Sequence, residues 1–249
     1  MINLIISLII GAASWVAFAI LFDSVPAGIL PFFVFTIAAL IVLNRRTAKK
    51  VSAITSRMAQ MMQSLPTLPS ENARKNLMDK AVEVAKEGYA FKNYQFFLGP
   101  QINSQIGQLY YVQKRFKEAE PYLKDSFFQP GTARAMYACI LFRNKDDLHM
   151  IEEFEKSVKF DKKTPLLWNL YAWCLNELKK RDEAIKVLNR CLAFNPTDKT
   201  TKENLDLLKN SGKVKMRGYN EQWYQFWLED PPQQKMMISP FDKRAQFRH

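Results

Sequence analysis

The stretch TPLLWNLYAWCLNELKKRDEAIKVLNRCLAFNPTD, residues 164–198, is the most informative about how this chain folds. Its apolar side chains recur three and four residues apart, which is the spacing of one face of an α-helix. One stripe starts at Trp168 and a second at Ala184, and a polar turn at 179–182 separates them. Pro196 ends the second stripe, because proline lacks a backbone N–H and disfavours helix at the residue before it. The stretch therefore predicts two short helices joined by a tight turn.

The spacing of these side chains resembles the tetratricopeptide (TPR) repeat. That repeat has the pattern W-x2-L-G-x2-Y, then A-x3-F, then P, with a period of about 34 residues. The corresponding positions are held, in order, by Trp168, Tyr171, Ala172, Leu175, Ala184, Leu188 and Pro196. An ordinary helical hairpin is the alternative. A TPR unit cannot bury its apolar face alone, so the resemblance implies neighbouring repeats.

Two more degenerate repeats precede this one. The matching positions are Ile106, Gly107, Tyr110, Ala119 and Leu123 in the first, and Tyr137, Ala138, Leu141, Met150 and Phe154 in the second. The second and third repeats are in register at 34 residues, whereas the first is shorter. We expect repeats at about 100–130, 131–164 and 165–198, and a capping helix at 199–210 with Leu205 and Leu208 facing inward.

Composition divides the chain into an apolar part and a polar part. The hydrophobic fraction is 48%, yet the mean hydropathy is −0.23, so the apolar residues must be concentrated in a few segments. The formal net charge is +12, with cations gathered after the apolar N-terminus and near the C-terminus. The three cysteines lack metal-ligand spacing, and their odd number predicts reduced thiols.

Residues 2–22 are almost uninterruptedly apolar, and a second apolar run covers 27–43. A helix of about 20 residues crosses the roughly 30 Å hydrocarbon core of a bilayer. We therefore expect residues 1–43 to form a transmembrane helical hairpin. A cleaved signal peptide fits less well, because no positive region precedes the first run and a second run follows at once. A buried soluble hairpin is the other alternative, but the rest of the chain offers little apolar surface to cover it.

Four cations directly follow the second run: Arg45, Arg46, Lys49 and Lys50. The loop between the runs carries only Asp23. The positive-inside rule therefore predicts that residues 44 onward, and the N-terminus with them, lie in the cytoplasm. We expect an integral protein of the bacterial inner membrane, with an organellar membrane and a periplasmic repeat domain as alternatives. The basic cluster would also attract anionic headgroups.

Residues 44–70 are expected to form a basic juxtamembrane helix and a proline-containing linker. Apolar residues at 51–65 predict either a short coiled-coil seam or packing on the soluble domain or the membrane surface. Ser70 then predicts the N-cap of a helix through about residue 95. This helix opens a TPR-like helical domain at 71–210.

We expect no enzyme, and no catalytic, cofactor-binding or metal site. The chain has only two histidines, His149 and His249, and it lacks the phosphate-loop, metalloprotease, C-x-x-C and nucleophile-elbow motifs. The adjacent acids at 146–147 and 152–153 fit solvated helix faces and helix N-termini.

The TPR resemblance implies a concave groove, lined by the first helix of each repeat, in which a protein partner binds. The predicted groove residues are Gln108, Tyr111, Arg143, Asn169, Trp173 and Asn176. Tyr111, Arg143 and Trp173 are the expected anchors, because aromatic residues and arginine dominate interface energetics. The alternative is that several of them pack between repeats. A lysine and asparagine clamp for a peptide carboxylate is incomplete here.

The basic, aromatic tail at 211–249 contains the segment QWYQFWL at 222–228. It could pack on its own solenoid, lie at the membrane interface or dock on a partner. We do not expect nucleic acid as a partner, because the cations flank the membrane and the tail and are not interleaved with aromatic residues on one face.

The sequence thus predicts an all-α protein with an N-terminal transmembrane hairpin, a short TPR-type α-solenoid and a C-terminal capping helix. The predicted function is a scaffold or adaptor that binds or assembles protein partners at the cytosolic face of a membrane. The alternatives are a non-catalytic subunit that positions or regulates a membrane-bound enzyme complex, and a periplasm-facing TPR assembly factor. Self-association into a homo-oligomer is also open.

Overall fold

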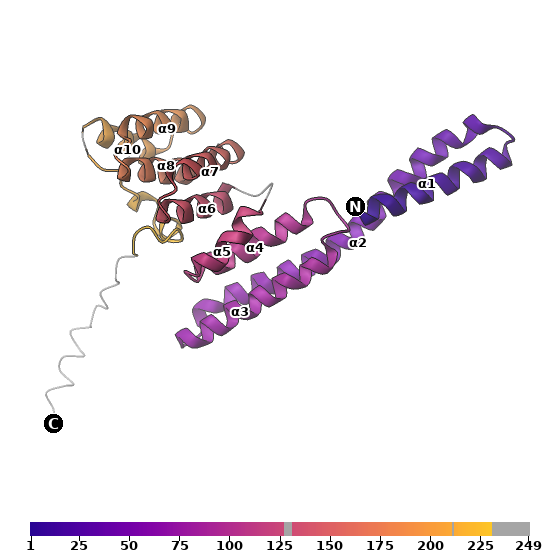
Figure 1. The fold of residues 1–249 in the computed structure, drawn as a ribbon, viewed down its shortest axis with the longest axis horizontal. Helices are drawn as coiled ribbons and strands as arrows, with labels where there is room; N and C mark the ends of the chain where they lie inside the picture. The colour runs from indigo at the N-terminus through magenta and orange to yellow at the C-terminus, as the bar shows by residue number, and fades with distance from the viewer. Residues whose placement is uncertain (127–130, 211, 231–249) are drawn as a thin grey trace, which may run out of the picture.

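The computed structural model describes residues 1–126, 131–210 and 212–230, and these ranges contain α-helices and short 3₁₀ turns but no β-strand (Figure 1). A long helical hairpin protrudes from one end, and short antiparallel helices stack at the other. The predicted all-α architecture is confirmed.

The hairpin consists of α1 (Ile2–Leu21), the 3₁₀ turn η1 (Val25–Gly28) and the first part of α2 (Ile29–Ser64). At a rise of 1.5 Å per residue, α1 is about 30 Å long, which matches the hydrocarbon core of a bilayer. In the most apolar 18-residue stretch of α1, only 11% of the residues are buried. In that of the segment Val25–Thr67, which contains α2, the share is 6%. Both helices are long and apolar enough to cross a membrane, and they are not the covered core of a soluble domain.

Small and polar side chains make the contact between α1 and α2. Gly11 faces Thr36 so closely that a Cβ atom at position 11 would overlap the Thr36 hydroxyl. Nearer the base of the hairpin, Asn3 Nδ2 donates to Asn44 Oδ1 and to Thr47 Oγ1, both at 3.0 Å. Polar groups therefore face inward and apolar side chains face outward, which is the reverse of a soluble hairpin.

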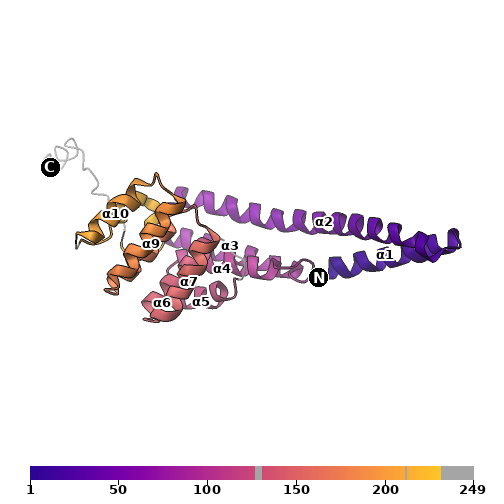
Figure 2. The ribbon, with the colours of Figure 1, turned by 90° about the horizontal axis from the view of Figure 1, so that it is seen from above.

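α2 runs for 36 residues without interruption, past the basic positions and along the soluble domain (Figure 2). Its later residues Ile54 and Met58 are buried and join the core of the soluble domain. Of the interpretations that the sequence left open for residues 51–65, the structure selects packing on that domain.

α3 (Glu71–Glu87) starts at its predicted cap but ends early. The Ser70 side chain accepts a hydrogen bond from the Ala73 N–H at 3.1 Å. The prediction that this helix continues to about residue 95 is wrong, because the 3₁₀ turn η3 (Gly88–Phe91) follows Glu87. At Gly88 the chain passes so close to the next helix that a Cβ atom would lie 3.1 Å from the Ile102 side chain.

Three helix pairs stack after η3. They are α4 (Leu98–Val112) with α5 (Phe116–Lys124), α6 (Gly131–Arg143) with α7 (Asp147–Phe160), and α8 (Pro165–Glu177) with α9 (Arg181–Phe194). α10 (Lys199–Lys209) covers the last pair, and its Leu205 and Leu208 are buried as predicted. The short solenoid and its capping helix are therefore confirmed.

The same turn closes each helix pair. Lys114, Lys145 and Lys179 occupy equivalent positions with φ of 60°, 61° and 61°. In the third turn the following N–H, of Lys180, reaches back to the Leu175 carbonyl at 2.9 Å, and the other two turns repeat this bond. A left-handed lysine is uncommon. Its recurrence shows that the degenerate repeats keep the backbone of the best-matched one.

The helices approach one another at the predicted small positions. Ala119, Ala138, Ala172 and Ala184 are fully buried. Met150, which stands where the repeat pattern has alanine, is also fully buried, so the core accommodates the larger side chain.

The contact between α4 and α5 generates a stability prediction. We expect Gly107→Ala to lower the free energy of unfolding by about 1 to 3 kcal/mol, because overpacking strains a core. The new Cβ atom would lie 2.7 Å from Leu123 Cγ and 3.1 Å from its backbone nitrogen. Gly99→Ala is the matched control in the same helix, since its Cβ atom would meet Lys92 Cβ at an ordinary 3.8 Å. Urea denaturation of the detergent-solubilised protein, followed by circular dichroism, measures both. Equal stability of the two variants would contradict this packing.

Candidate functional site

The chain's own residues 213–228 lie across α4, α6, α8 and α10, on the face where the groove is predicted. This tail contains η4 (Arg217–Tyr219) and α11 (Glu221–Tyr224). Val214, Met216, Trp223 and Phe226 are at most 5% exposed, as in a protein core. Of the three interpretations of the tail, the structure selects packing on its own solenoid. The basic end at 231–249 lies outside the described residues.

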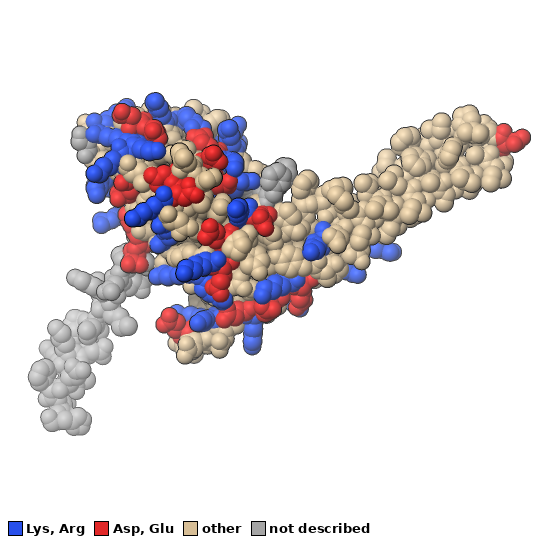
Figure 3. Space-filling view, in the orientation of Figure 1, with Lys and Arg blue, Asp and Glu red and all other residues tan. Residues whose placement is uncertain are grey.

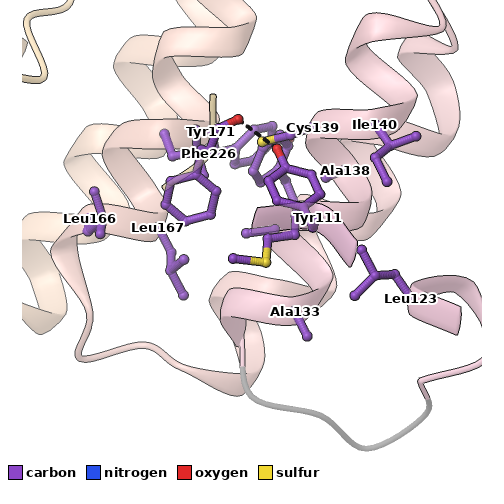
Figure 4. Packing of buried hydrophobic residues seen from close by; sticks show 14 of the residues in the cluster. Tyr111, Leu123, Ala133, Ala138, Cys139, Ile140, Leu166, Leu167, Tyr171 and Phe226 are labelled. Carbon is purple, nitrogen blue, oxygen red and sulfur yellow. Dashed lines mark hydrogen bonds between the residues drawn. The ribbon is translucent and has the colours of Figure 1, made fainter. Parts of the chain in front are cut away.

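Tyr111 on α4 binds the backbone of the tail through its side chain (Figure 4). The fully buried Tyr111 hydroxyl donates to the Phe226 carbonyl oxygen at 2.6 Å. Burial raises the pKa of Tyr111 well above its usual value, so the hydroxyl keeps its proton and can donate. Because the acceptor is a main-chain carbonyl, this hydrogen bond does not depend on the identity of the side chain at position 226.

Two cations hold the next residue of the tail, Trp227. The Arg143 guanidinium donates to the Trp227 carbonyl oxygen and lies over the Phe116 ring, 4.5 Å from its centroid. Lys114 Nζ lies 4.0 Å from the centroid of the Trp227 ring, which is a cation–π contact. The end of the groove formed by α4, α5 and α6 thus binds both the backbone and the ring of Trp227.

Trp173 on α8 belongs to a row of aromatic rings that continues into the tail. Its centroid lies 6.0 Å from that of Phe142 on α6 and 5.3 Å from that of Trp223, both edge to face. Such pairs contribute about 0.5 to 1.5 kcal/mol beyond the area that they bury. The Trp223 indole Nε1 also donates to Glu229 Oε2 at 3.0 Å. The row therefore joins two repeats and the tail.

Asn169 on α8 is a fully buried polar hub. Its Nδ2 lies 2.7 Å from both Thr201 Oγ1 and the Tyr219 hydroxyl, and its Oδ1 accepts from Asn204 Nδ2 at 2.9 Å. Asn204 in turn bonds both backbone groups of Lys215, at 2.7 Å to the N–H and 2.9 Å to the carbonyl. The two asparagines thus fasten the start of the tail to α8 and α10.

The other two predicted groove residues are placed differently. Gln108 Nε2 donates to Ser104 Oγ in its own helix at 3.0 Å, and Asn176 is half-buried near the end of α8. The structure therefore gathers Tyr111, Arg143, Asn169 and Trp173 around the tail. Whether these residues bind a partner protein stays a prediction.

Sequence reasoning missed Asn204, which pairs with both a groove residue and the tail. A signal was available, because Asn204 follows Asn169 by 35 residues, close to one repeat period. It lies on the capping helix α10, where the apolar spacing indicates only the inward leucines.

Two of the four acidic residues at 146–147 and 152–153 form ion pairs. Asp146 caps α7 and pairs with exposed His149 at 2.8 Å, as predicted for a helix N-terminus. The expectation of a solvated face is wrong for Glu153: its side chain is only 14% exposed and pairs with Arg134 on α6 at 2.9 Å. Within the described ranges, no three His, Cys, Asp or Glu side chains are grouped so that they could hold a metal ion.

The predicted membrane-flanking cations Arg45, Arg46, Lys49 and Lys50 are exposed on α2, directly after the hairpin. Figure 3 shows the surface of the hairpin without charged side chains until its far tip, whereas cations gather at its base. The surface of α2 therefore changes from uncharged to positively charged between Asn44 and Lys50.

The contact between Tyr111 and the tail can be tested by removing a single atom, the Tyr111 hydroxyl oxygen. We expect Tyr111→Phe to leave the Phe226 carbonyl without its donor and to lower the free energy of local opening of the tail by about 1 to 3 kcal/mol. Tyr110→Phe is the matched control, since this neighbour's ring packs on Tyr122, with 5.6 Å between centroids. Hydrogen–deuterium exchange of residues 213–228 measures the effect. Unchanged exchange in Tyr111→Phe would show that this hydrogen bond does not hold the tail.

Comparison with known proteins identifies one segment. Residues 166–198, which cover α8 and α9, match the family model described as tetratricopeptide repeat. No curated protein and no solved structure matches the chain. This is the stretch whose spacing carries the resemblance in the sequence. The chain thus contains a tetratricopeptide repeat within an all-helical fold, and two apolar helices long enough to cross a membrane precede it.

Proposed function

We propose that this chain is a membrane-anchored TPR scaffold that binds a protein partner at the cytosolic face of a membrane. The occupied groove is the observation that carries the proposal. Its helices hold an aromatic segment of protein chain by backbone carbonyls and by rings. A surface that binds one segment through backbone carbonyls and aromatic rings can bind another segment that presents the same groups. The TPR match supports a role in protein–protein interaction rather than in catalysis.

The hairpin supports anchoring in a membrane. Its outer surface is apolar over about 30 Å of helix, and its polar groups are turned inward, as a lipid environment requires. The cations on α2 directly after its apolar part favour a cytosolic position for the soluble domain. The Met1 ammonium donates to the Asn93 carbonyl at 2.8 Å, so the N-terminus lies on the same side as that domain.

The groove also indicates which partner segment would fit. Trp223 and Phe226, three residues apart, fill two fully buried sites next to a short helical turn. Glu229 and Asp230 then lie with Lys114 and Arg143 around one small cleft. A fitting segment would carry two aromatic residues three apart, followed by acidic residues.

The tail would compete with such a partner. A segment joined by a short linker acts at an effective concentration on the order of millimolar. A free partner at micromolar concentration would therefore need roughly a thousandfold higher intrinsic affinity, or its own attachment to the same membrane, to displace the tail. Anchoring both proteins in one membrane supplies that second route.

Membrane topology is the first test. We expect alkaline phosphatase inserted after Ser24 to be active, because the turn between α1 and α2 would lie outside the cytoplasm, and the same enzyme fused after residue 249 to be inactive. Fusions of green fluorescent protein at the two positions should give the opposite pattern. An active phosphatase at the C-terminus would contradict a cytosolic repeat domain.

Partner binding is the second test, by crosslinking in cells followed by quantitative co-purification. We expect Trp223→Ala with Phe226→Ala to raise partner recovery, because the tail leaves the groove. Arg143→Ala with Trp173→Ala should lower it several-fold, because groove contacts are lost.

Leu148→Ala is the control for this experiment, since Leu148 is 75% exposed on α7. Circular dichroism must show that each variant keeps its helical content. If neither pair of substitutions changes recovery relative to Leu148→Ala, the groove is not the binding site.

A further inference from the structure

The loop at 92–97, which joins η3 to α4, exposes three aromatic side chains. Tyr94 is 37% exposed, Phe96 52% and Phe97 56%. Phe97 has φ of 63°, a conformation that is unfavourable for a bulky residue. Large exposed rings on a strained backbone cluster where a surface meets another medium or molecule.

Hydrogen bonds fix this loop to the base of the apolar hairpin. The Met1 ammonium and the Ile2 N–H donate to the Asn93 carbonyl at 2.8 and 2.9 Å. On the other helix, Gln95 Nε2 donates to the Asn44 carbonyl at 2.9 Å. The loop thus satisfies N–H groups at the start of α1, which have no partner within that helix. It lies level with the start of α1 and with the end of the apolar part of α2.

Two of the rings, those of Tyr94 and Phe96, border the apolar surface of the hairpin. Tyr94 and Phe96 line an open cleft of about 360 Å³ together with Leu4 and Leu40. Leu40 lies one helical turn before Asn44, about 6 Å further into the apolar part of α2. The aromatic surface of the loop is therefore continuous with the apolar surface of the hairpin.

Exposed cations lie in the loop and on the stretch of α2 that follows Asn44, and Lys50 Nζ lies 5.7 Å from the centroid of the Phe91 ring, directly before the loop. The cations are Lys92 in the loop itself and Arg45, Arg46, Lys49 and Lys50 on α2. Aromatic rings level with the ends of apolar helices, next to cations, form the pattern of a membrane–water interface with anionic headgroups. A second protein with an apolar face would not require this cationic rim.

We propose that the 92–97 loop is a third membrane contact, which inserts Phe96 and Phe97 into the headgroup–acyl boundary of the anionic leaflet beside the hairpin. This inference rests on the proposed anchoring of α1 and α2 in a membrane. The contact fixes the tilt of the repeat array, because the loop leads directly into α4. The groove would then be held at a set angle to the bilayer.

Site-directed spin labelling of the full-length protein tests the proposal. Cys139, Cys174 and Cys191 are fully buried. Burial also raises the pKa of Cys174, and that of Cys191 to about 11, so these thiols should not be labelled in the folded protein. Single nitroxides at Phe96→Cys and Phe97→Cys can thus be read in vesicles of phosphatidylethanolamine and phosphatidylglycerol. Collision with oxygen reports lipid, and collision with a water-soluble nickel complex reports water.

Three further labels calibrate the result. Ile9→Cys reports on the middle of α1, where Ile9 is 63% exposed. Lys92→Cys reports on a charged position of the loop, and Leu148→Cys is the reference for a position in water. We expect the oxygen-to-nickel collision ratio at 96 and 97 to exceed that at 148 several-fold and to lie between the ratios at 92 and 9.

The outcomes separate the two proposals. If the label at Ile9 reports lipid while those at 96 and 97 resemble Leu148, the anchor stands and the loop contact is wrong. If both labels in the loop are shielded from oxygen and from nickel, a protein covers them and the lipid contact is also wrong. A label at Ile9 that reports water would overturn the anchor itself.

Discussion

The rest of the structure depends on the continuity of α2. This single helix turns apolar side chains outward in its first part and contributes Ile54 and Met58 to the core of the soluble domain in its second. Because one unbroken ladder of backbone hydrogen bonds runs through both parts, the hairpin and the repeats cannot move independently as they would on a flexible linker. The hydrogen bonds that Met1 donates to Asn93 and that Gln95 donates to the Asn44 carbonyl add a second connection between the hairpin and the soluble domain.

The groove shows how a short solenoid manages an apolar concave face. Three helix pairs and a cap would leave rings such as that of Trp173 open to water, and the tail covers them with Trp223 and Phe226. The tail is therefore part of the core and, at the same time, an occupant of the face where a partner is proposed to bind. Partner binding would then be coupled to local opening of the tail, whose free energy would be subtracted from the intrinsic affinity.

Much of the fold followed from local patterns. The spacing from Trp168 to Pro196 predicted one helix pair. The small residues Gly107 and Ala138, at the equivalent position of the pattern, predicted two further, degenerate repeats. Errors arose where tertiary contact replaced local preference. Where the chain approaches α4 closely at Gly88, α3 has already ended at Glu87, and α6 covers Glu153, which an isolated helix would leave in water. The left-handed lysines of the turns had no sequence signal, because lysine rarely adopts that conformation.

The sequence by itself determined the helical class, the repeat unit and the two apolar lengths that fit a membrane, because periodicity and hydropathy are properties of neighbouring residues. It also pointed to Tyr111, Arg143, Asn169 and Trp173 as residues of one face. Only the tertiary structure decided what lies against them. The bond from Tyr111 to Phe226 joins residues 115 positions apart, and no periodic pattern encodes a contact at that separation. The same holds for the loop that meets the start of α1, since its place depends on how two distant segments pack.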